Sequence, residues 1–410
     1  MERWKEYKAM EFCSGVTDGT HDSPKPKTFG HYLITSKHLK DNRIDFSSAN
    51  QISEEDYQKV ILRSAVEQYD ILFSMIGTIG NTVQVKQEIV DFAVKNMGIF
   101  KMGRNQLKST WLYYWLNSVY SKQYINQRLA GSTQSYLTLD SLRNFPVSYP
   151  GDDIANSIIS ILKSLDDKIE VNRRINDNLE QQAQALFKSW FVDFEPFRDG
   201  EFVESELGLI PKGWRVGTFL DNIYVMPGGT PSTSKNEYWE DGTIPFFSPK
   251  DVNGVYCFET EKSVTELGLK NCSSHLYPKD TLFITARGTV GKLTLAGVPM
   301  AMNQSNYALV AKEGISKFYL FLLAQTLVSV LLKKANGAVF SAITTRDFNE
   351  PTIIPKTSDM EQFDKLVSPI FYKIHQTSCE SRRLATLRDT LLPKLMSGEI
   401  KVFDKPNDQS

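Results

Sequence analysis

The chain has 410 residues, of which 41% are hydrophobic and 23% are charged, and this composition excludes a disordered or fibrous protein. Its length is too great for one ordinary core and suits two to four domains. The formal net charge of −1 argues against a protein that holds nucleic acid by bulk positive charge. The cysteines are widely spaced and form no C-x-x-C pair, which argues against a zinc ribbon or a disulfide framework and favours a reducing compartment.

No segment of the sequence is expected to cross a membrane. Residues 1–12 contain no apolar signal core. The most apolar run, residues 318–332, is short for a membrane span and includes Gln325, Thr326 and Ser329. We therefore predict a buried helix at this run, in a cytoplasmic protein.

In chain order, the sequence predicts a globular domain, a long helix, a second globular domain and a second long helix. Both domains are expected to be α+β, because β-prone segments between glycine turns (residues 281–286) accompany segments with helical spacing (residues 111–129). The second helix is expected to end near Pro393 and Gly398, which stop helices. The predicted boundaries are 1–150 for the first domain, 151–209 for the first helix and an acidic link, 210–355 for the second domain, 356–400 for the second helix and 401–410 for a polar tail.

The second half of the chain repeats the first at a spacing of about 210 residues, which predicts two copies of one module. The clearest block aligns residues 70–73 (Asp-Ile-Leu-Phe) with residues 280–283 (Asp-Thr-Leu-Phe) at a spacing of 210. The glycine turns at 77–80 and 288–291 are 211 apart, so this alignment needs one inserted residue. Further pairs at 210 are Trp4 with Trp214, Gly19-Thr20 with Gly229-Thr230, and Lys25 with Lys235.

Both predicted helices carry a seam of residues that are seven or fourteen positions apart, and the two seams are 205 residues apart. A strict seam of this kind needs a partner, so we predict that the helices pair antiparallel about a pseudo-two-fold axis and separate the two domains. The alternative is that each helix packs on its own domain. Asn172 and Thr377 lie in mid-seam, where a polar residue can fix register at some cost in stability. The predicted seam consists of Ile158, Leu165, Asn172, Leu179 and Leu186 in the first helix and Phe363, Ile370, Thr377, Leu384 and Leu391 in the second.

Several motifs together resemble a known family. Residues 211–214 read Pro-Lys-Gly-Trp, residues 228–232 read Gly-Gly-Thr-Pro-Ser, and residues 244–251 read Ile-Pro-Phe-Phe-Ser-Pro-Lys-Asp. The chain closes with Leu-Leu-Pro-Lys-Leu-Met-Ser-Gly-Glu-Ile at 391–400. This combination resembles the specificity (S) subunit of type I restriction–modification systems over nearly the full length. The first domain departs from the pattern, because it lacks the Pro-x-Gly-Trp opening and has Gly-Thr-His-Asp at 19–22.

The resemblance implies two target-recognition domains, each of which reads one half of an asymmetric, bipartite DNA site. It also implies that the paired helices set the unread gap and dock two methyltransferase (modification) subunits, which methylate adenine with S-adenosylmethionine. Restriction (translocase) subunits that hydrolyse ATP would join this core to cut unmethylated DNA. The expected partners are therefore double-stranded DNA and these subunits, with no membrane.

None of that chemistry is expected in this chain itself. The sequence has no G-x-x-x-x-G-K-[ST] phosphate loop, no Asn-Pro-Pro-aromatic motif of amino-methyltransferases, and no H-E-x-x-H or Cys/His cluster. We therefore expect no catalytic residue, no metal and no cofactor. Residues 151–209 hold 13 acidic and 6 basic residues, so the first helix and its link are a poor surface for phosphate and suit a protein partner or simply solvent.

Polar side chains in the loops of both domains are the candidates for DNA contacts, because base readout needs donors and acceptors that reach the base edges. Arg287 precedes a glycine turn and suits a bidentate contact to guanine or phosphate, whereas Asn303 and Gln304 could pair with adenine. The turn glycines are expected to shape the backbone instead. The full candidate set is Thr20, His21, Ser23, Lys25, Ser36, Lys37, Ser132, Thr133 and Gln134 in the first domain and Thr230, Ser232, Ser234, Lys235, Lys250, Arg287, Asn303 and Gln304 in the second.

Two other classes of function are compatible with the sequence. One is a protein-binding coiled-coil scaffold without DNA recognition, and the other is an enzyme with an unrecognised hydrolytic site in the glycine-turn loops. Duplex binding that weakens steeply with salt would argue against the scaffold, because phosphate contacts release counterions. Turnover by the chain alone would favour the enzyme.

Overall fold

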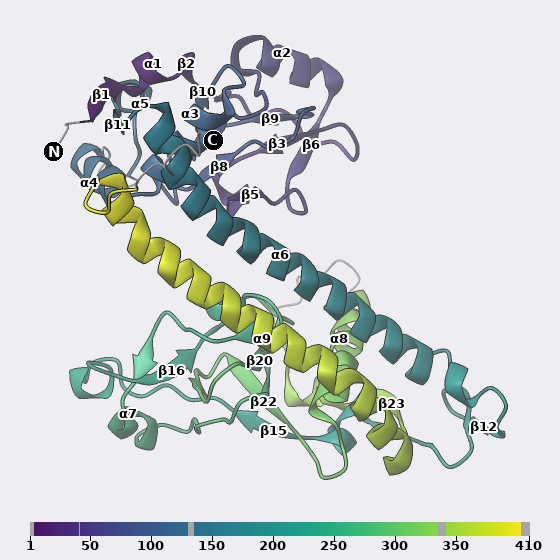
Figure 1. Cartoon of the computed structure of the whole chain (residues 1–410). Helices are drawn as coiled ribbons and strands as arrows, with labels where there is room; N and C mark the ends of the chain where they lie inside the picture. The colour runs from purple at the N-terminus through teal and green to yellow at the C-terminus, as the bar shows by residue number, and fades with distance from the viewer. Residues whose placement is uncertain (1–3, 41, 130–134, 335–341, 403–410) are drawn as a thin grey trace, which may run out of the picture. The chain divides into compact units, whose positions relative to one another are not determined.

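The structure is a computed structural model that describes residues 4–40, 42–129, 135–334 and 342–402 (Figure 1). The chain divides into two compact units. Unit 1 comprises Met1–Lys168 and Leu384–Ser410, and unit 2 comprises Ile169–Arg383. Each unit combines sheets with helices, so the predicted α+β class is confirmed.

Unit 1 is built on an antiparallel sheet of four strands. Their order is β2 (Gly15–Asp18), β10 (Met97–Lys101), β7 (Ile71–Ser74) and β8 (Thr82–Gln84). A three-stranded sheet has the order β6 (Asn50–Ile52), β3 (His31–Ile34) and β9 (Phe92–Val94), in which β3 and β9 run parallel. Two strand pairs complete the unit, namely β1 (Lys5–Lys8) with β11 (Pro146–Tyr149) and β4 (Leu39–Lys40) with β5 (Arg43–Ile44).

The helical segment expected over residues 111–129 is two helices, α3 (Gln106–Leu116) and α4 (Val119–Arg128). The break follows from the sequence, because Ser118 is an N-cap whose side chain accepts from the N–H of Ser121 at 3.5 Å. Trp111 of α3 is fully buried in the main core of the unit. The other helical turns of the unit are α1 (Ala9–Phe12), the 3-10 turn η1 (Ser36–His38), α2 (Glu54–Ser64) and α5 (Leu139–Arg143).

Unit 2 repeats this plan with one added edge strand. Its larger sheet has the order β15 (Ile223–Pro227), β22 (Asn306–Ala311), β19 (Leu282–Thr285), β20 (Leu293–Ala296) and β17 (Tyr256–Cys257). Its three-stranded sheet has the order β18 (Ser263–Val264), β16 (Ile244–Phe247) and β21 (Ala301–Met302), and β16 runs parallel to β21 as β3 does to β9. The remaining strand pairs are β14 (Arg215–Thr218) with β23 (Pro351–Ile354) and β12 (Phe202–Ser205) with β13 (Gly208–Pro211).

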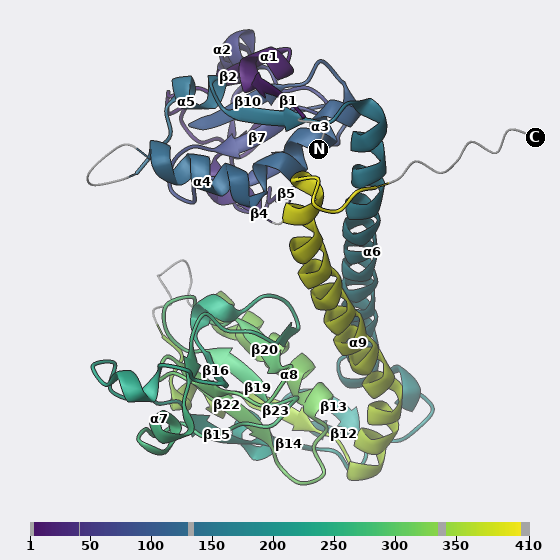
Figure 2. The same cartoon turned by 60° about the vertical axis from the view of Figure 1, so that its left-hand side comes forward.

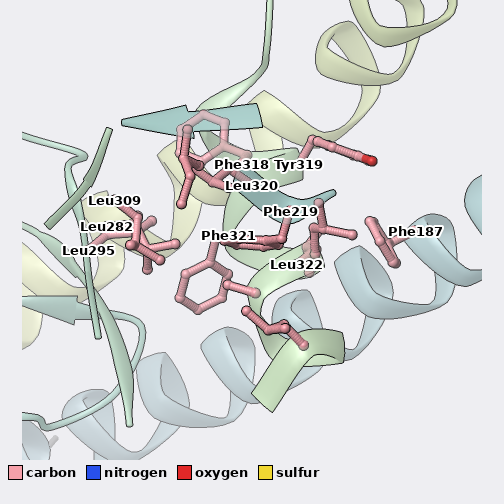
Figure 3. Close-up of a cluster of buried hydrophobic side chains, with 14 of the residues drawn as sticks. Phe187, Phe219, Leu282, Leu295, Leu309, Phe318, Tyr319, Leu320, Phe321 and Leu322 are labelled. Carbon is pink, nitrogen blue, oxygen red and sulfur yellow. The ribbon is translucent and has the colours of Figure 1, made fainter. Parts of the chain in front are cut away.

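The apolar run at residues 318–332 forms a buried helix, as predicted. It lies in α8 (Lys317–Lys334), whose side chains occupy the space between Leu282, Leu295 and Leu309 of the sheet and Phe187 (Figure 3). Within the ranges that the structure describes, no helix is both long and apolar enough to span a membrane. The shorter helical turns of unit 2 are η2 (Glu195–Phe197), η3 (Phe219–Asn222), η4 (Asn236–Tyr238), η5 (Pro249–Asp251), α7 (Glu266–Lys270) and η6 (Thr345–Asn349).

The two long helices are α6 (Asp152–Phe191) and α9 (Thr357–Met396), and they pair antiparallel in each unit as predicted. In unit 2 they lie side by side, as Figure 2 shows. There the ring centroids of Phe191 and Phe363 are 4.7 Å apart. Nearer the N-terminal end of α6, the amide of Asn172 donates a hydrogen bond to Glu380 of α9. In unit 1, Asp166 of α6 accepts a hydrogen bond from Arg388 of α9 at 2.7 Å.

The internal repeat is present, but its strand register differs by one residue from the predicted alignment. Tyr69 donates its N–H to Val85, and Asp280 donates its N–H to Ala296 in the same place of the second copy. Tyr69 and Asp280 also share a left-handed φ, of 67° and 68°. Tyr69 is therefore the equivalent of Asp280, at a spacing of 211. The alignment of Asp70 with Asp280 is wrong, and no inserted residue separates this block from the glycine turn.

Candidate nucleic-acid interface

Six of the predicted seam residues belong to the domain cores or pack against them: Ile158 and Leu391 in unit 1, and Leu179, Leu186, Phe363 and Ile370 in unit 2. Within unit 2, α6 and α9 are joined by polar groups at mid-seam as well as by apolar ones. Four seam residues are buried, namely Ile158, Asn172, Phe363 and Thr377. The partly buried ones are Leu165, Leu179, Leu186, Ile370, Leu384 and Leu391.

The mid-seam polar residues form a hydrogen-bonded cluster inside unit 2. The amide of Asn172 donates to the carboxylate of Glu380 at 2.8 Å, and the amide of Asn176 donates to Ser378 at 3.0 Å. The hydroxyl of Thr377 donates to the amide oxygen of Asn176. Because these bonds need particular residues to face one another, they favour a single register of the two helices.

In unit 1, a loop and a turn meet at a point that we call the first junction, made of residues 19–23 and 94–97. Gly19 donates its N–H to the carbonyl of Met97 at 2.8 Å, and Thr20 donates to Val94 at 3.0 Å. The N–H of Asn96 donates back to Thr20 at 3.1 Å. A Cβ on Gly19 would lie 2.3 Å from the carbonyl oxygen of Val94, so this close approach requires glycine.

The first junction presents polar side chains to solvent. The imidazole of His21 lies with Nδ1 at 2.8 Å from Oδ1 of Asn96 and with Nε2 at 3.0 Å from the carboxylate of Asp18. Asp18 is buried and also accepts from Arg63, so the ring is anchored to the sheet and to α2. The side chain of His21 is nevertheless 64% exposed.

The same junction brings two other candidates together with a lysine. The hydroxyl of Thr20 accepts the N–H of Asp22 at 3.1 Å, and the hydroxyl of Ser23 accepts from the ammonium of Lys95. Lys95 and Asn96 are absent from the predicted set. They precede Asn303 and Gln304 by 208 residues, so extending the repeat through the turn after β9 would have found them.

Unit 2 has an equivalent second junction, made of residues 228–230 and 302–306. Gly228 donates its N–H to Asn306 at 3.4 Å, and Gly229 donates to Met302 at 3.2 Å. These bonds match those of Gly19 and Thr20, which lie 209 residues earlier. Their acceptors Met97 and Val94 lie 209 and 208 residues before Asn306 and Met302, so the second turn is one residue longer. The predicted pairing of Gly19-Thr20 with Gly229-Thr230 at 210 is therefore one residue out of register.

The candidates at the second junction take different roles. The hydroxyl of Thr230 donates to the amide oxygen of Gln304, and both side chains are exposed. Asn303 shapes the turn, because its Oδ1 accepts from the N–H of Ser305 at 3.0 Å and from the amide of Asn306 at 2.7 Å. Arg287 lies beside this turn: its N–H donates to the carbonyl of Ser305 at 3.2 Å, and its side chain is exposed.

The remaining candidates lie on neighbouring loops. Ser232 and Ser234 are within 2.9 Å of each other, and Lys235 donates to the hydroxyl of Tyr238 at 3.0 Å, a bond that raises the pKa of Lys235. Lys250 lies on η5 and pairs with Glu261 at 3.5 Å. Ser36 and Lys37 lie on η1, the equivalent turn of unit 1, and Lys25 is exposed. Ser132, Thr133 and Gln134 lie outside the described residues.

The match to a protein-family model shows which family the chain belongs to. The model of the type I restriction modification DNA specificity domain matches residues 22–181 and, a second time, residues 211–366. The chain belongs to this family. Both matches contain the turn of a junction and run from a globular domain into the long helix that follows it. The DNA specificity domain is thus present in two copies, and the chain has a role in DNA sequence recognition. In this role it interacts with DNA and with other subunits of a type I system.

Individual specificity subunits are similar to the chain over most of its length. The specificity subunit of the type I restriction enzyme MjaIX from Methanocaldococcus jannaschii is 30% identical over 301 residues, which are 72% of this chain and 69% of that protein. The HindI specificity subunit from Haemophilus influenzae is 26% identical and covers 98% of this chain and 100% of its own. The crystal structure of a type I S subunit from M. genitalium covers 96% of both chains at a TM-score of 0.51 and 14% identity, a likeness of fold.

Proposed function

We propose that the chain is the DNA-recognition subunit of a type I restriction–modification complex and that it carries no active site of its own. Each globular domain reads one half of an asymmetric, bipartite DNA site. Adenine methylation and ATP-dependent cleavage belong to the modification and restriction subunits that assemble with it. The candidate loop residues around the two junctions make the DNA contacts in this proposal.

The observation that carries the proposal is the pair of junctions. The backbone hydrogen bonds of Gly19 and Thr20 recur at Gly228 and Gly229, whereas the exposed side chains beside them differ. A shared scaffold with different donors and acceptors is what two readers of unlike sequences require, because base contacts specify sequence and the scaffold only positions them. A scaffold whose two domains bound the same protein would give no reason for these side chains to differ between the copies.

The helices have a separate role in the proposal. Both long helices have 40 residues, and each carries one copy of the seam. Helices of equal length that pair in one register can hold two readers at a fixed spacing. The paired helices are proposed to dock two methyltransferase subunits, and the excess of acidic residues in 151–209 makes the first helix and its link unsuited to phosphate.

A domain exchange tests the modular reading of DNA. Residues 1–150 are replaced by the corresponding domain of another specificity subunit, and the full chain is co-expressed with its modification subunits. Mapping of methylated adenines is expected to show one half-site replaced, with the other half-site and the gap unchanged. A target that is scrambled in both halves, or that remains unaltered, would contradict the proposal.

A further inference from the structure

The two junctions hold equivalent pairs of polar side chains, of which His21, Thr230 and Gln304 are exposed and Asn96 is half-buried. His21 follows Gly19 by two residues as Thr230 follows Gly228, and Asn96 and Gln304 occupy the turn that faces them. His21 contacts the amide oxygen of Asn96 at 2.8 Å, and Thr230 donates to the amide oxygen of Gln304. In each copy of the repeat, the side chain two residues after the glycine therefore contacts the oxygen of a side-chain amide in the facing turn.

Local backbone geometry explains only part of this. Asn96 has a φ of 54°, a left-handed conformation that asparagine tolerates, so its presence has a structural reason. Gln304 has no such reason, because it is not among the residues with positive φ. Since the conformations differ and the amide recurs, the amide group itself is the shared feature.

The free side of each amide suits a base edge. Among the described residues, none accepts a hydrogen bond from the amide nitrogen of Asn96 or Gln304, so both –NH2 groups are available. A carbonyl oxygen has two lone pairs, so the contact with His21 or Thr230 leaves one of them free. An amide with a free donor and a free acceptor matches N7 and the N6 amino group of adenine in the major groove.

We propose that Asn96 and Gln304 are specificity-determining residues, each of which reads one adenine, the first in one half-site and the second in the other. His21 and Thr230 are positioning residues that orient the two amides, and the Asp18 carboxylate anchors His21. This inference rests on the proposed function and deepens it, because it names the reading group in each domain.

The test uses substitutions that separate reading from folding. The full chain with its modification subunits carries Gln304→Glu, Gln304→Ala or Asn96→Gly, and methylated adenines are mapped across a randomised duplex library. Asn96→Gly keeps the left-handed backbone while removing the amide. Asn349→Ala, an exposed amide on η6 outside both junctions, is the matched control and is expected to leave the target unchanged.

The expected result is a change at one base position in one half-site for each substitution. Gln304→Ala and Asn96→Gly are expected to lower the preference for adenine there by about tenfold or more, in different half-sites. Gln304→Glu is expected to shift that position towards cytosine, because a carboxylate accepts from the cytosine amino group. This gain cannot arise from misfolding.

Two other outcomes would overturn the inference. If methylation falls equally on all sequences while the target stays the same, the amides have a structural or phosphate-contacting role, and the proposed function stands. If the unsubstituted complex shows no bipartite target, the proposed function fails together with the inference.

Discussion

The hydroxyl groups of Ser74 and Thr285 stabilise the two glycine turns in the same way. Thr285 is fully buried, accepts the N–H of Lys292 at 2.9 Å and donates to the carbonyl of Thr289. Ser74 makes the same two contacts in unit 1. A hydroxyl at the end of the strand therefore forms hydrogen bonds with the backbone N–H and carbonyl groups that the turn leaves unpaired.

Substitution of this hydroxyl gives a stability prediction. Thr285→Val keeps the shape of the side chain but leaves the N–H of Lys292 without its acceptor, so the free energy of unfolding is expected to fall by about 1–2 kcal/mol. Thr285→Ser is the matched control, because serine already fills this place in unit 1, and it is expected to cost much less. Urea denaturation measures both; an equal loss for the two variants would show that the methyl group matters and the hydroxyl does not.

At the scale of single elements, strand register is the feature that sequence comparison placed wrongly. The matched letters Leu-Phe at 72–73 and 282–283 suggest a spacing of 210, but the strands align at 211. Side chains alternate between the two faces of a sheet, so a slip of one residue exchanges the faces. Phe73 lies in the core with Trp111, whereas Phe283 lies in the separate cluster with Phe247, so the two are not equivalent. Identity of letters could not reveal this, because both faces of these strands are apolar.

Helices and turns with a strong local signal were predictable. The seam of α6 and α9 follows from its seven-residue spacing, and the glycine turns follow from their composition. The junctions were half predictable: polar loop residues such as Thr20 and Thr230 stand out, but Asn96 does not. Its position depends on the pairing of β9 with β3, which joins segments about sixty residues apart in the chain and leaves no local pattern.

The polar cluster in the helix pair of unit 2 gives a prediction at the same scale. Asn172→Ala removes the amide that donates to Glu380 and leaves a small gap in a fully buried position. The free energy of unfolding is expected to fall by about 1–2 kcal/mol, although alanine itself favours the helix. Gln181→Ala, at an exposed position of the same helix, is the control and should not destabilise the protein. Calorimetry measures the unfolding of both chains. If Asn172→Ala unfolded at the same temperature as the original chain, the polar cluster would not contribute to stability.

In the whole molecule, each unit is completed by parts of both long helices. The core of unit 2 contains Phe187 and Phe191 of α6 together with Phe363 of α9. The core of unit 1 contains Ile158 of α6 together with Leu392, Leu395 and Met396 of α9. Phe187, Phe191 and Ile158 correspond to Leu392, Met396 and Phe363 at the spacing of 205 residues that relates the helices. Each unit therefore uses the beginning of the helix that follows its own domain and the end of the other helix, so neither helix serves one unit alone.

Because each helix contributes to both units, a change in helix length affects both units at once. This leads to a prediction about the DNA target. Seven residues with the seam pattern are inserted after Lys168 in α6 and after Arg383 in α9, where the segments that belong to each unit end. A seven-residue insertion preserves the seam and lengthens each helix by about 10 Å, which corresponds to about three base pairs. Mapping of methylated adenines is expected to show both half-sites unchanged and the gap wider by about that amount.

The control for this experiment is the same insertion in α6 alone. Because the helices pair antiparallel, an insertion in one of them leaves its added seam residues without a partner and shifts the Asn172 cluster out of register. The single insertion is expected to lower stability and to abolish site-specific methylation. An unchanged gap in the double insertion, with both half-sites still read, would mean that the helices do not set the spacing, whereas altered half-sites would mean that they take part in reading the bases.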